Sequence, residues 1–283
     1  MPTALRDIAV FLDASPAGVK IGRQAAELAR RFDAHLIGVY GVSRANDTNR
    51  FAGFARGAAA MSQVTASRRN EEERKILAAG HRFADLTREY GISSEFRIVW
   101  REGLDDDSVL RALQCDLIVS THPRPDDLPA SWSAERLLLQ TGTPVLLIPA
   151  TWEGEAIGDH VVIAWNRSRE SRRAVGDAMP FIRSAGRTTI LTVDAARDAE
   201  HFGEEPGLNL RHHLSRHEVQ ADVVSIDAQG ASVADMIASW LAEHGGDLLI
   251  FGAYSRSRAS ELLFGGTTRS LLASAVAPML VSR

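Results

Sequence analysis

The sequence has almost no cysteine, no long apolar run and no excess of positive charge. Of 283 residues only Cys115 is a cysteine, which excludes an internal disulfide and a thiolate-rich metal site. No apolar run reaches the roughly 18 residues that cross a bilayer, and the first residues lack the pattern of a secretory signal. Lys and Arg number 32 against 36 Asp and Glu, so no cationic surplus favours nucleic acid. We expect a cytoplasmic protein that binds neither membranes nor nucleic acid.

The chain repeats itself. The run DIAVFLDAS, which begins at Asp7, returns as HVVIAWNRS from His160, and HLIGVYGV from His35 returns as TTILTVDA from Thr188. Later pairs are FRIVWREG with VVSIDAQG, DLIVS with DLLIF, and PVLLIP with PMLVSR. A length near twice the roughly 150 residues of a typical domain agrees with two copies of one domain.

Each copy alternates apolar runs with helical patterns. Consecutive Val, Ile and Leu predict strands that are buried on both faces, hence a parallel sheet covered by helices. Apolar residues recur at helical spacing between these runs, as in Val233, Met236, Ile237 and Leu241. The sequence therefore predicts two five-stranded α/β domains in tandem.

The spacing of the copies locates an insertion and a linker. The first copy has extra residues between its second and third strands, around 43–62, whose small and polar residues suit a surface excursion. The polar segment 151–159 suits a domain boundary. We expect domains at 1–150 and 159–283.

One loop of the second copy suggests an anion site. In an open parallel sheet, ligands bind at the carboxyl ends of the strands. There Gly265, Gly266, Thr267 and Thr268 lead into a helix, whose first turn offers unpaired N–H groups and a favourable dipole for phosphate. Arg256, Arg258 and Arg269 add positive charge nearby. The same pattern also suits an ordinary helix cap without a ligand.

The tandem arrangement, the Asp13-Ala-Ser15 strand end and the pattern Gly252-x2-Ser255-x9-Gly265-Gly266-Thr267 resemble the universal stress protein family in its two-domain bacterial form. The resemblance implies doubly wound, adenine nucleotide alpha hydrolase-like domains with strand order 3-2-1-4-5, paired through their last strands. It also implies ATP or a related adenine nucleotide as ligand, with Mg left open. The implied binding residues are Asn166, Ser168, Val193, Gly252, Ser255, Gly265, Gly266, Thr267 and Thr268.

The pattern departs from that of the nucleotide-binding relatives at three positions. Ser255 replaces a glycine, Gly266 stands where Ser or Thr is usual, and Asn166 replaces an Asp, keeping an acceptor but losing its charge. In the first copy the loop after Ser120 carries three prolines and the pair Asp126 and Asp127, which oppose phosphate binding. At most one nucleotide per chain is expected, in the second domain.

Three functions stay open at this stage. The first is a stress-response module that binds an adenine nucleotide without fast turnover. The second is a nucleotide-free interaction protein whose pocket is lost. The third is a slow ATPase, although no general base or metal ligand is convincingly placed. A homodimer and an unidentified protein partner also stay open.

Other motifs are set aside. His201, His212, His213 and His217 are read as a solvated helix face rather than a zinc site. No Gly-x-Ser-x-Gly elbow and no Gly-x4-Gly-Lys-Ser/Thr loop occurs, which disfavours a hydrolase and a P-loop ATPase. Cys115 precedes an apolar strand and is read as a buried side chain, not a nucleophile.

Overall fold

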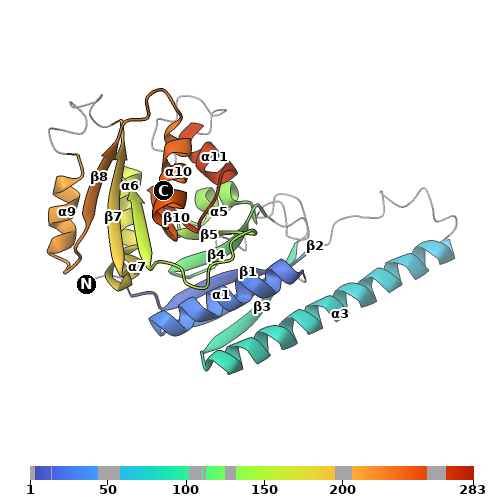
Figure 1. Ribbon diagram of the computed structural model, residues 1–283. Coiled ribbons are helices and arrows are strands. Elements are labelled where there is room, and N and C mark those ends of the chain that lie inside the picture. The colour runs from blue at the N-terminus through green and yellow to red at the C-terminus, as the bar shows by residue number, and fades with distance from the viewer. Residues whose placement is uncertain are drawn as a thin grey trace. The chain divides into compact units, whose positions relative to one another are not determined.

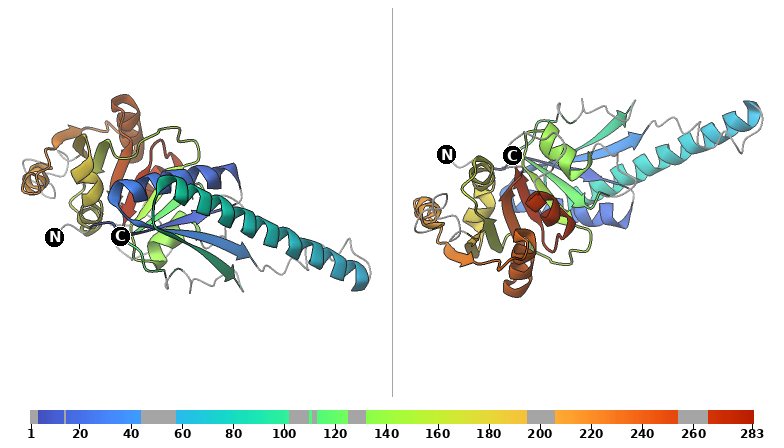
Figure 2. Two further views of the ribbon diagram at one scale, coloured as in Figure 1. Left: turned by 90° about the horizontal axis from the view of Figure 1, so that it is seen from below. Right: turned by 90° about the horizontal axis from the view of Figure 1, so that it is seen from above.

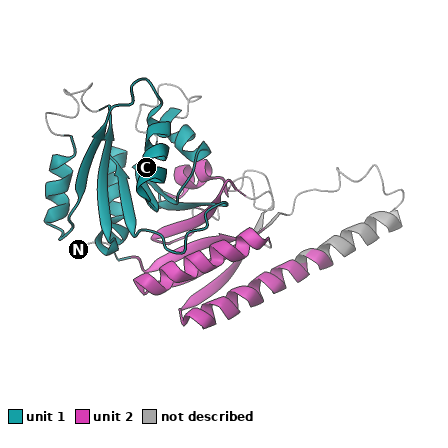
Figure 3. Ribbon diagram, in the orientation of Figure 1, with its two compact units in different colours: residues 1–4, 142–283 teal, residues 5–141 magenta. Residues whose placement is uncertain are grey.

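The computed structural model describes residues 4–13, 15–43, 58–101, 110, 113–124, 132–194, 206–253 and 266–283. The chain packs as two compact units, which Figure 3 separates by colour. Unit 2 comprises Leu5–Thr141, and unit 1 comprises Gly142–Arg283 together with Met1–Ala4. The last strand of the first repeat is thus counted with unit 1. The division into domains at 1–150 and 159–283 stays a prediction.

Unit 2 contains a parallel sheet with strand order β3-β2-β1-β4. Its elements are β1 (Asp7–Leu12), α1 (Pro16–Phe32), β2 (His35–Ser43), α3 (Ala58–Tyr90), β3 (Ser94–Arg101), β4 (Leu117–His122) and α5 (Ala134–Gln140). Helices α1 and α3 lie side by side (Figure 2), and a side-chain methyl of Leu86 in α3 lies 3.5 Å from where a Cβ at Gly22 of α1 would stand. In the core, Phe11 stacks on Trp132 with ring centroids 4.4 Å apart.

Unit 1 contains the second copy of the fold and one strand from the first (Figure 1). Its elements are β5 (Val145–Pro149), β6 (His160–Ala164), α6 (Arg169–Asp177), α7 (Met179–Ser184), β7 (Arg187–Val193), α9 (Leu208–Ser215), β8 (Asp222–Ile226), α10 (Val233–His244), β9 (Leu248–Gly252), α11 (Gly266–Ala273) and β10 (Met279–Ser282). The parallel strands run in the order β8-β7-β6-β9-β10, which is the predicted 3-2-1-4-5.

The last strands of the two copies pair with each other, as predicted. β10 runs antiparallel to β5, with Met279 opposite Leu147 and Val281 opposite Val145. Every residue of both strands is buried. Because an unpaired apolar edge attracts other strands, this pairing covers the edge that each copy would otherwise expose.

An aspartate fastens the amino end of the first strand in each copy. Asp247 accepts three backbone N–H groups, from Gly158, Asp159 and His160, at 2.9, 3.0 and 3.1 Å. Asp116, the matching residue of the first copy, accepts those of Arg6 and Asp7 at 2.7 and 3.0 Å. The sequence showed that both aspartates precede matching strands, but only the structure reveals what they bind.

The predicted insertion overlaps the start of a long helix. Helix α3 begins at Ala58, inside the segment 43–62 that was predicted to be a surface excursion, and runs for 33 residues. The run Ala58-Ala-Ala-Met has high helix propensity, which agrees with this start. Residues 44–57 lie outside the described ranges. None of the helices in the described ranges is both long enough and apolar enough to cross a membrane.

Candidate functional site

The candidate site begins with the turn between β6 and α6. The side-chain oxygen of Asn166 accepts the backbone N–H of Ser168 at 3.1 Å, and Arg167 between them has a left-handed φ of 58°. The Ser168 hydroxyl oxygen then accepts the N–H of Ser171 at 3.0 Å, which caps α6. Asn166 is exposed, whereas Ser168 is half-buried. Asn166 therefore both shapes the turn and presents its side chain to solvent at the end of β6.

Val193 is the last residue of β7 and pairs with Ile226 of β8. The residue after it, Asp194, has φ 54° and donates its N–H to the carbonyl of Ile226 at 2.9 Å. The Asp194 carboxylate accepts the N–H of Ala228 at 2.8 Å, so it joins the ends of β7 and β8. Asp194 was not among the predicted site residues, although an Asp directly after an apolar run is a known turn signal.

Gly252 ends β9 against the first turn of α6. A Cβ at position 252 would lie 2.2 Å from the carbonyl carbon of Glu170 and 2.3 Å from the nitrogen of Ser171. No side chain fits there without moving the backbone. Glycine at 252 is therefore explained by packing between β9 and α6, whether or not a ligand binds.

Gly266 is the first residue of α11 and has the opposite surroundings. No heavy atom of the described residues lies within 4 Å of where its Cβ would stand, and the residue is exposed. Thr267 is exposed, while Thr268 is 6% exposed and packs inward with Leu271 and Leu272. Of the two threonines offered as hydroxyl donors, Thr267 has the more accessible position, and Thr268 contributes to the fold.

Strand pairing brings Asn166, Val193 and Gly252 to one edge of the sheet in unit 1. β6 lies between β7 and β9, with Ala164 opposite Leu191 and Ile163 opposite Ile250. Trp165 continues the ladder by donating its N–H to Leu191 at 2.9 Å. Asn166, Val193 and Gly252 thus lie at the carboxyl ends of three neighbouring parallel strands, where open α/β sheets bind their ligands. Ser255 and Gly265, together with Arg256 and Arg258, lie outside the described residues.

The structure also shows the surroundings of Cys115 and of the histidines in and after α9. Burial, with the neighbouring charges of Asp116 and Asp7, raises the pKa of Cys115 to about 12, so its thiol is protonated at neutral pH and weakly nucleophilic. His213 and His217 face each other with ring centroids 4.8 Å apart, and α9 ends between them at Ser215. In the described ranges no three His, Cys, Asp or Glu residues are grouped to hold a metal ion.

Comparisons with known proteins agree with this architecture. Residues 158–283 match the model of the universal stress protein family. A universal stress protein from Archaeoglobus fulgidus is similar over 98% of both chains, with 13% identity and a TM-score of 0.70. A second from Pseudomonas aeruginosa has 17% identity and a TM-score of 0.58, and covers 99% of this chain and 93% of its own.

A universal stress protein in complex with cAMP covers 53% of this chain and 100% of its own, with 16% identity and a TM-score of 0.35. The sequence matches no curated protein. At these identities the similarity of the first half to the solved structures shows its fold alone. The family model matches residues of the second half. The chain carries a domain of the universal stress protein family in residues 158–283 and has the tandem fold of that family.

Proposed function

We propose that unit 1 binds ATP or a related adenine nucleotide at the carboxyl ends of β6, β7 and β9, and that the bound nucleotide regulates the protein without being turned over quickly. The phosphates would approach the start of α11 at Gly266 and Thr267. The ribose and adenine would lie along Asn166 and the end of β7 at Val193. Three further residues would hold these positions in place. Ser168 caps α6, Gly252 lets β9 pack closely against α6, and Thr268 is buried in α11.

The contrast between two glycines carries the proposal. Gly252 is required by the backbone of α6, whereas nothing in the described chain approaches Gly266. Glycine is tolerated at the start of a helix, and its missing side chain leaves the backbone N–H groups of the first turn uncovered. Helix N-termini bind phosphate through N–H groups that lack intrahelical partners, and a glycine there gives an anion room to approach.

The surroundings of Asn166 add a second support. Its side chain is exposed at the end of the central strand, and its oxygen is already oriented by the bond to Ser168. A ribose hydroxyl can pair with a carboxamide as donor or acceptor. The lost negative charge weakens a charge-assisted bond to ribose but also removes repulsion toward phosphate.

The proposal is tested on protein purified gently from its host and then denatured. Mass spectrometry of the released small molecules should find an adenine nucleotide at no more than one per chain. Titration of nucleotide-free protein with ATP, AMP and cAMP should then show saturable binding of at least one of them. Absence of bound nucleotide together with three flat titrations would leave the protein as a nucleotide-free interaction module. Phosphate release above a buffer control would instead indicate an ATPase.

A further inference from the structure

Unit 2 ends in an edge strand that is long and regular. β3 pairs with β2 from Ser94 opposite Leu36 to Arg101 opposite Ser43, and within the described residues no strand pairs with its other side. Edge strands of this kind offer a row of N–H and C=O groups to another strand. The corresponding edge strand of unit 1, β8, is shorter at five residues.

The side chains of β3 favour one particular partner, which is β3 of a second copy. If two β3 strands run antiparallel with Phe96 opposite Phe96, then Glu95 of each copy lies opposite Arg97 of the other. Moving the centre to Glu95 or Arg97 places like charges opposite each other, which is unfavourable. Glu95 and Arg97 are exposed and form an ion pair within one chain, so they share one face of the strand. On β8 the residues Asp222–Ile226 offer no opposite charges for such a pairing.

Helix α3 has a face directed past this edge. Around the helix, Leu86 approaches Gly22 of α1, the Phe83 ring contacts Gly38 of β2 and Phe96 of β3, and Gly80 lies over Phe96. Each step of three residues back along the helix turns it by about 60°. Leu77, three residues before Gly80, therefore points one step further, beyond β3.

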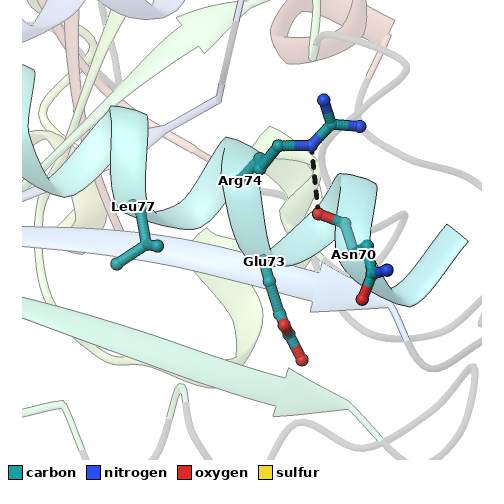
Figure 4. Close-up of a pocket in the computed structure, with 4 residues that line it drawn as sticks. All are labelled: Asn70, Glu73, Arg74 and Leu77. Carbon is teal, nitrogen blue, oxygen red and sulfur yellow. Dashed lines mark hydrogen bonds between the residues drawn. The ribbon is translucent and has the colours of Figure 1, made fainter. Parts of the chain in front are cut away.

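That face is open and contains an apolar side chain. Leu77 is 61% exposed, and Ile98 of β3 is 42% exposed. Among the described residues, Asn70, Glu73, Arg74 and Leu77 line a hollow of about 490 Å³, and Figure 4 shows Leu77 and Glu73 on the same side of α3. The hollow therefore lies along the helix face that β3 does not cover.

The spacing of a paired arrangement suits helix packing. Phe83 of α3 contacts Gly38 of β2 and Phe96 of β3, which corresponds to a helix axis about half a strand spacing inside β3. With strands about 4.8 Å apart, two α3 helices related by a two-fold axis through the β3 pair would lie about 10 Å apart. This is the ordinary distance of packed helices, about 8–10 Å.

The exposed residues of α3 also complement their own copies. Because Gly80 lies over Phe96, the two-fold axis would pass near Gly80 and His81. Leu77 would then meet Ala84 of the second copy, and Glu73 would meet Arg88 of the second copy. All four residues are exposed in the single chain, and Gly80 is small enough to allow close approach at the centre.

We propose that the protein forms a symmetric dimer through antiparallel pairing of β3 centred on Phe96, with the α3 helices packed beside it. Strand pairing supplies the hydrogen bonds, the Glu95 and Arg97 pairs fix the register, and Leu77 adds apolar contact. The proposal does not depend on nucleotide binding, because it involves unit 2 alone.

A charge-exchange experiment tests it. Sedimentation equilibrium should give the wild-type chain twice its mass of 30.8 kDa. Arg97→Glu and Glu95→Arg should each be monomeric at the same concentration, because each places like charges opposite each other. Mixed together in equal amounts, the two variants should restore a dimer containing one of each. The double exchange E95R/R97E should dimerise as the wild type does.

Two results would overturn the proposal. One is a wild type that stays monomeric, and the other is a dimer that both single variants leave intact. Circular dichroism of the single variants separates loss of pairing from loss of fold. For the helix contact, Leu77→Glu should weaken the dimer at least tenfold, while Val19→Glu, at a 40% exposed position of α1, should leave it unchanged. Equal weakening by the two would reject α3 as part of the interface.

Discussion

The two copies of the fold build the same turn after their first strand and use it differently. In unit 2, Asp13 accepts the N–H of Ser15 at 2.6 Å, and Ser15 caps α1 through Gly18 at 3.2 Å. In unit 1, Asn166 and Ser168 make the matching bonds to Ser168 and Ser171. An acceptor at the strand end is therefore a requirement of the fold, and finding one is not by itself evidence of a ligand.

The difference lies in how the following helix packs. At Gly18 a Cβ would stand 2.3 Å from the Asp13 carbonyl oxygen, so only glycine lets α1 come this close, and Asp13 is 6% exposed. Ser171 occupies the matching position in α6, and Asn166 is exposed. The first copy thus buries its strand-end side chain, and the second presents it. Accessibility, rather than residue type, distinguishes the copy that we propose as the nucleotide site.

The largest expected effect concerns the other end of the strands. Asp247→Ala removes the acceptor of three backbone N–H groups, whereas Asp116→Ala removes that of two. Bonds to a charged acceptor contribute about 1.5–3 kcal/mol each, with incomplete loss because water enters. We expect Asp247→Ala to lower the free energy of unfolding by about 3 kcal/mol and Asp116→Ala by less. Urea unfolding of both variants measures this, and a larger loss at Asp116 would contradict the comparison.

The next effect separates the two glycines of the proposed site. Gly252→Ala forces a methyl group into the backbone of α6, and such overpacking costs about 1–3 kcal/mol. Gly266→Ala meets no atom of the described residues, and the free energy of unfolding should stay unchanged or rise slightly. Thermal unfolding of the pair checks this. Similar destabilisation by both substitutions would show that Gly266 is packed as tightly as Gly252.

A third prediction concerns His160, which has no histidine counterpart in the first copy. Burial, reinforced by the positive charge of Arg187 and opposed by the carbonyl of His244 and by Asp247, lowers the pKa of His160 below 6.5. Its ring also contacts Thr189 at 3.0 Å and lies edge-on to Trp240. Between the lowered pKa and 6.5 the unfolded chain binds more protons, so stability is complete above pH 6.5 and is lost as pH falls below it.

The slope contributed by His160 is at most about 1.4 kcal/mol per pH unit. Urea unfolding between neutral and mildly acidic pH should therefore show a steeper decline for the wild type than for His160→Gln. Parallel declines for the two proteins would mean that His160 titrates normally in the folded state.

The smallest effect is expected at Asn166. Asn166→Asp keeps the acceptor for Ser168, so unfolding should change by less than about 0.5 kcal/mol. The carboxylate forms a stronger bond to a ribose hydroxyl, and we expect nucleoside affinity to rise severalfold. Adenosine titration is the direct measurement because it omits the phosphates. A fall in adenosine affinity would place the ribose away from Asn166.

Much of the fold could be predicted because its signals are local or repeated. Consecutive Val, Ile and Leu identified the buried strands, and the repeat identified their equivalence. The start of α3 at Ala58 was not predicted, because the second copy has no counterpart of the insertion from which the repeat could indicate its structure. The hydrogen bonds to the Asp247 carboxylate join residues that are 87 to 89 positions apart in the sequence. Periodicity carries no information about such pairings.

The site was only partly predictable from the sequence. The order Gly252, Gly266 and Thr267 indicated a phosphate loop, but a glycine pattern does not distinguish close packing from space for a ligand. That distinction depends on which backbone lies opposite each Cα, as Glu170 does for Gly252 and no described residue does for Gly266. The sequence likewise could not show that Thr268 is buried whereas Thr267 is exposed.

Binding of ATP by two glycine variants measures nucleotide binding at α11 most directly. Gly266→Val places a branched side chain at the start of α11. Gly176→Val places one near the end of α6, and at both positions a Cβ meets no atom of the described residues within 4 Å. Isothermal titration should show ATP affinity reduced at least tenfold by Gly266→Val and unchanged by Gly176→Val, with both variants folded. Wild-type affinity in the Gly266→Val protein would contradict phosphate binding at this helix.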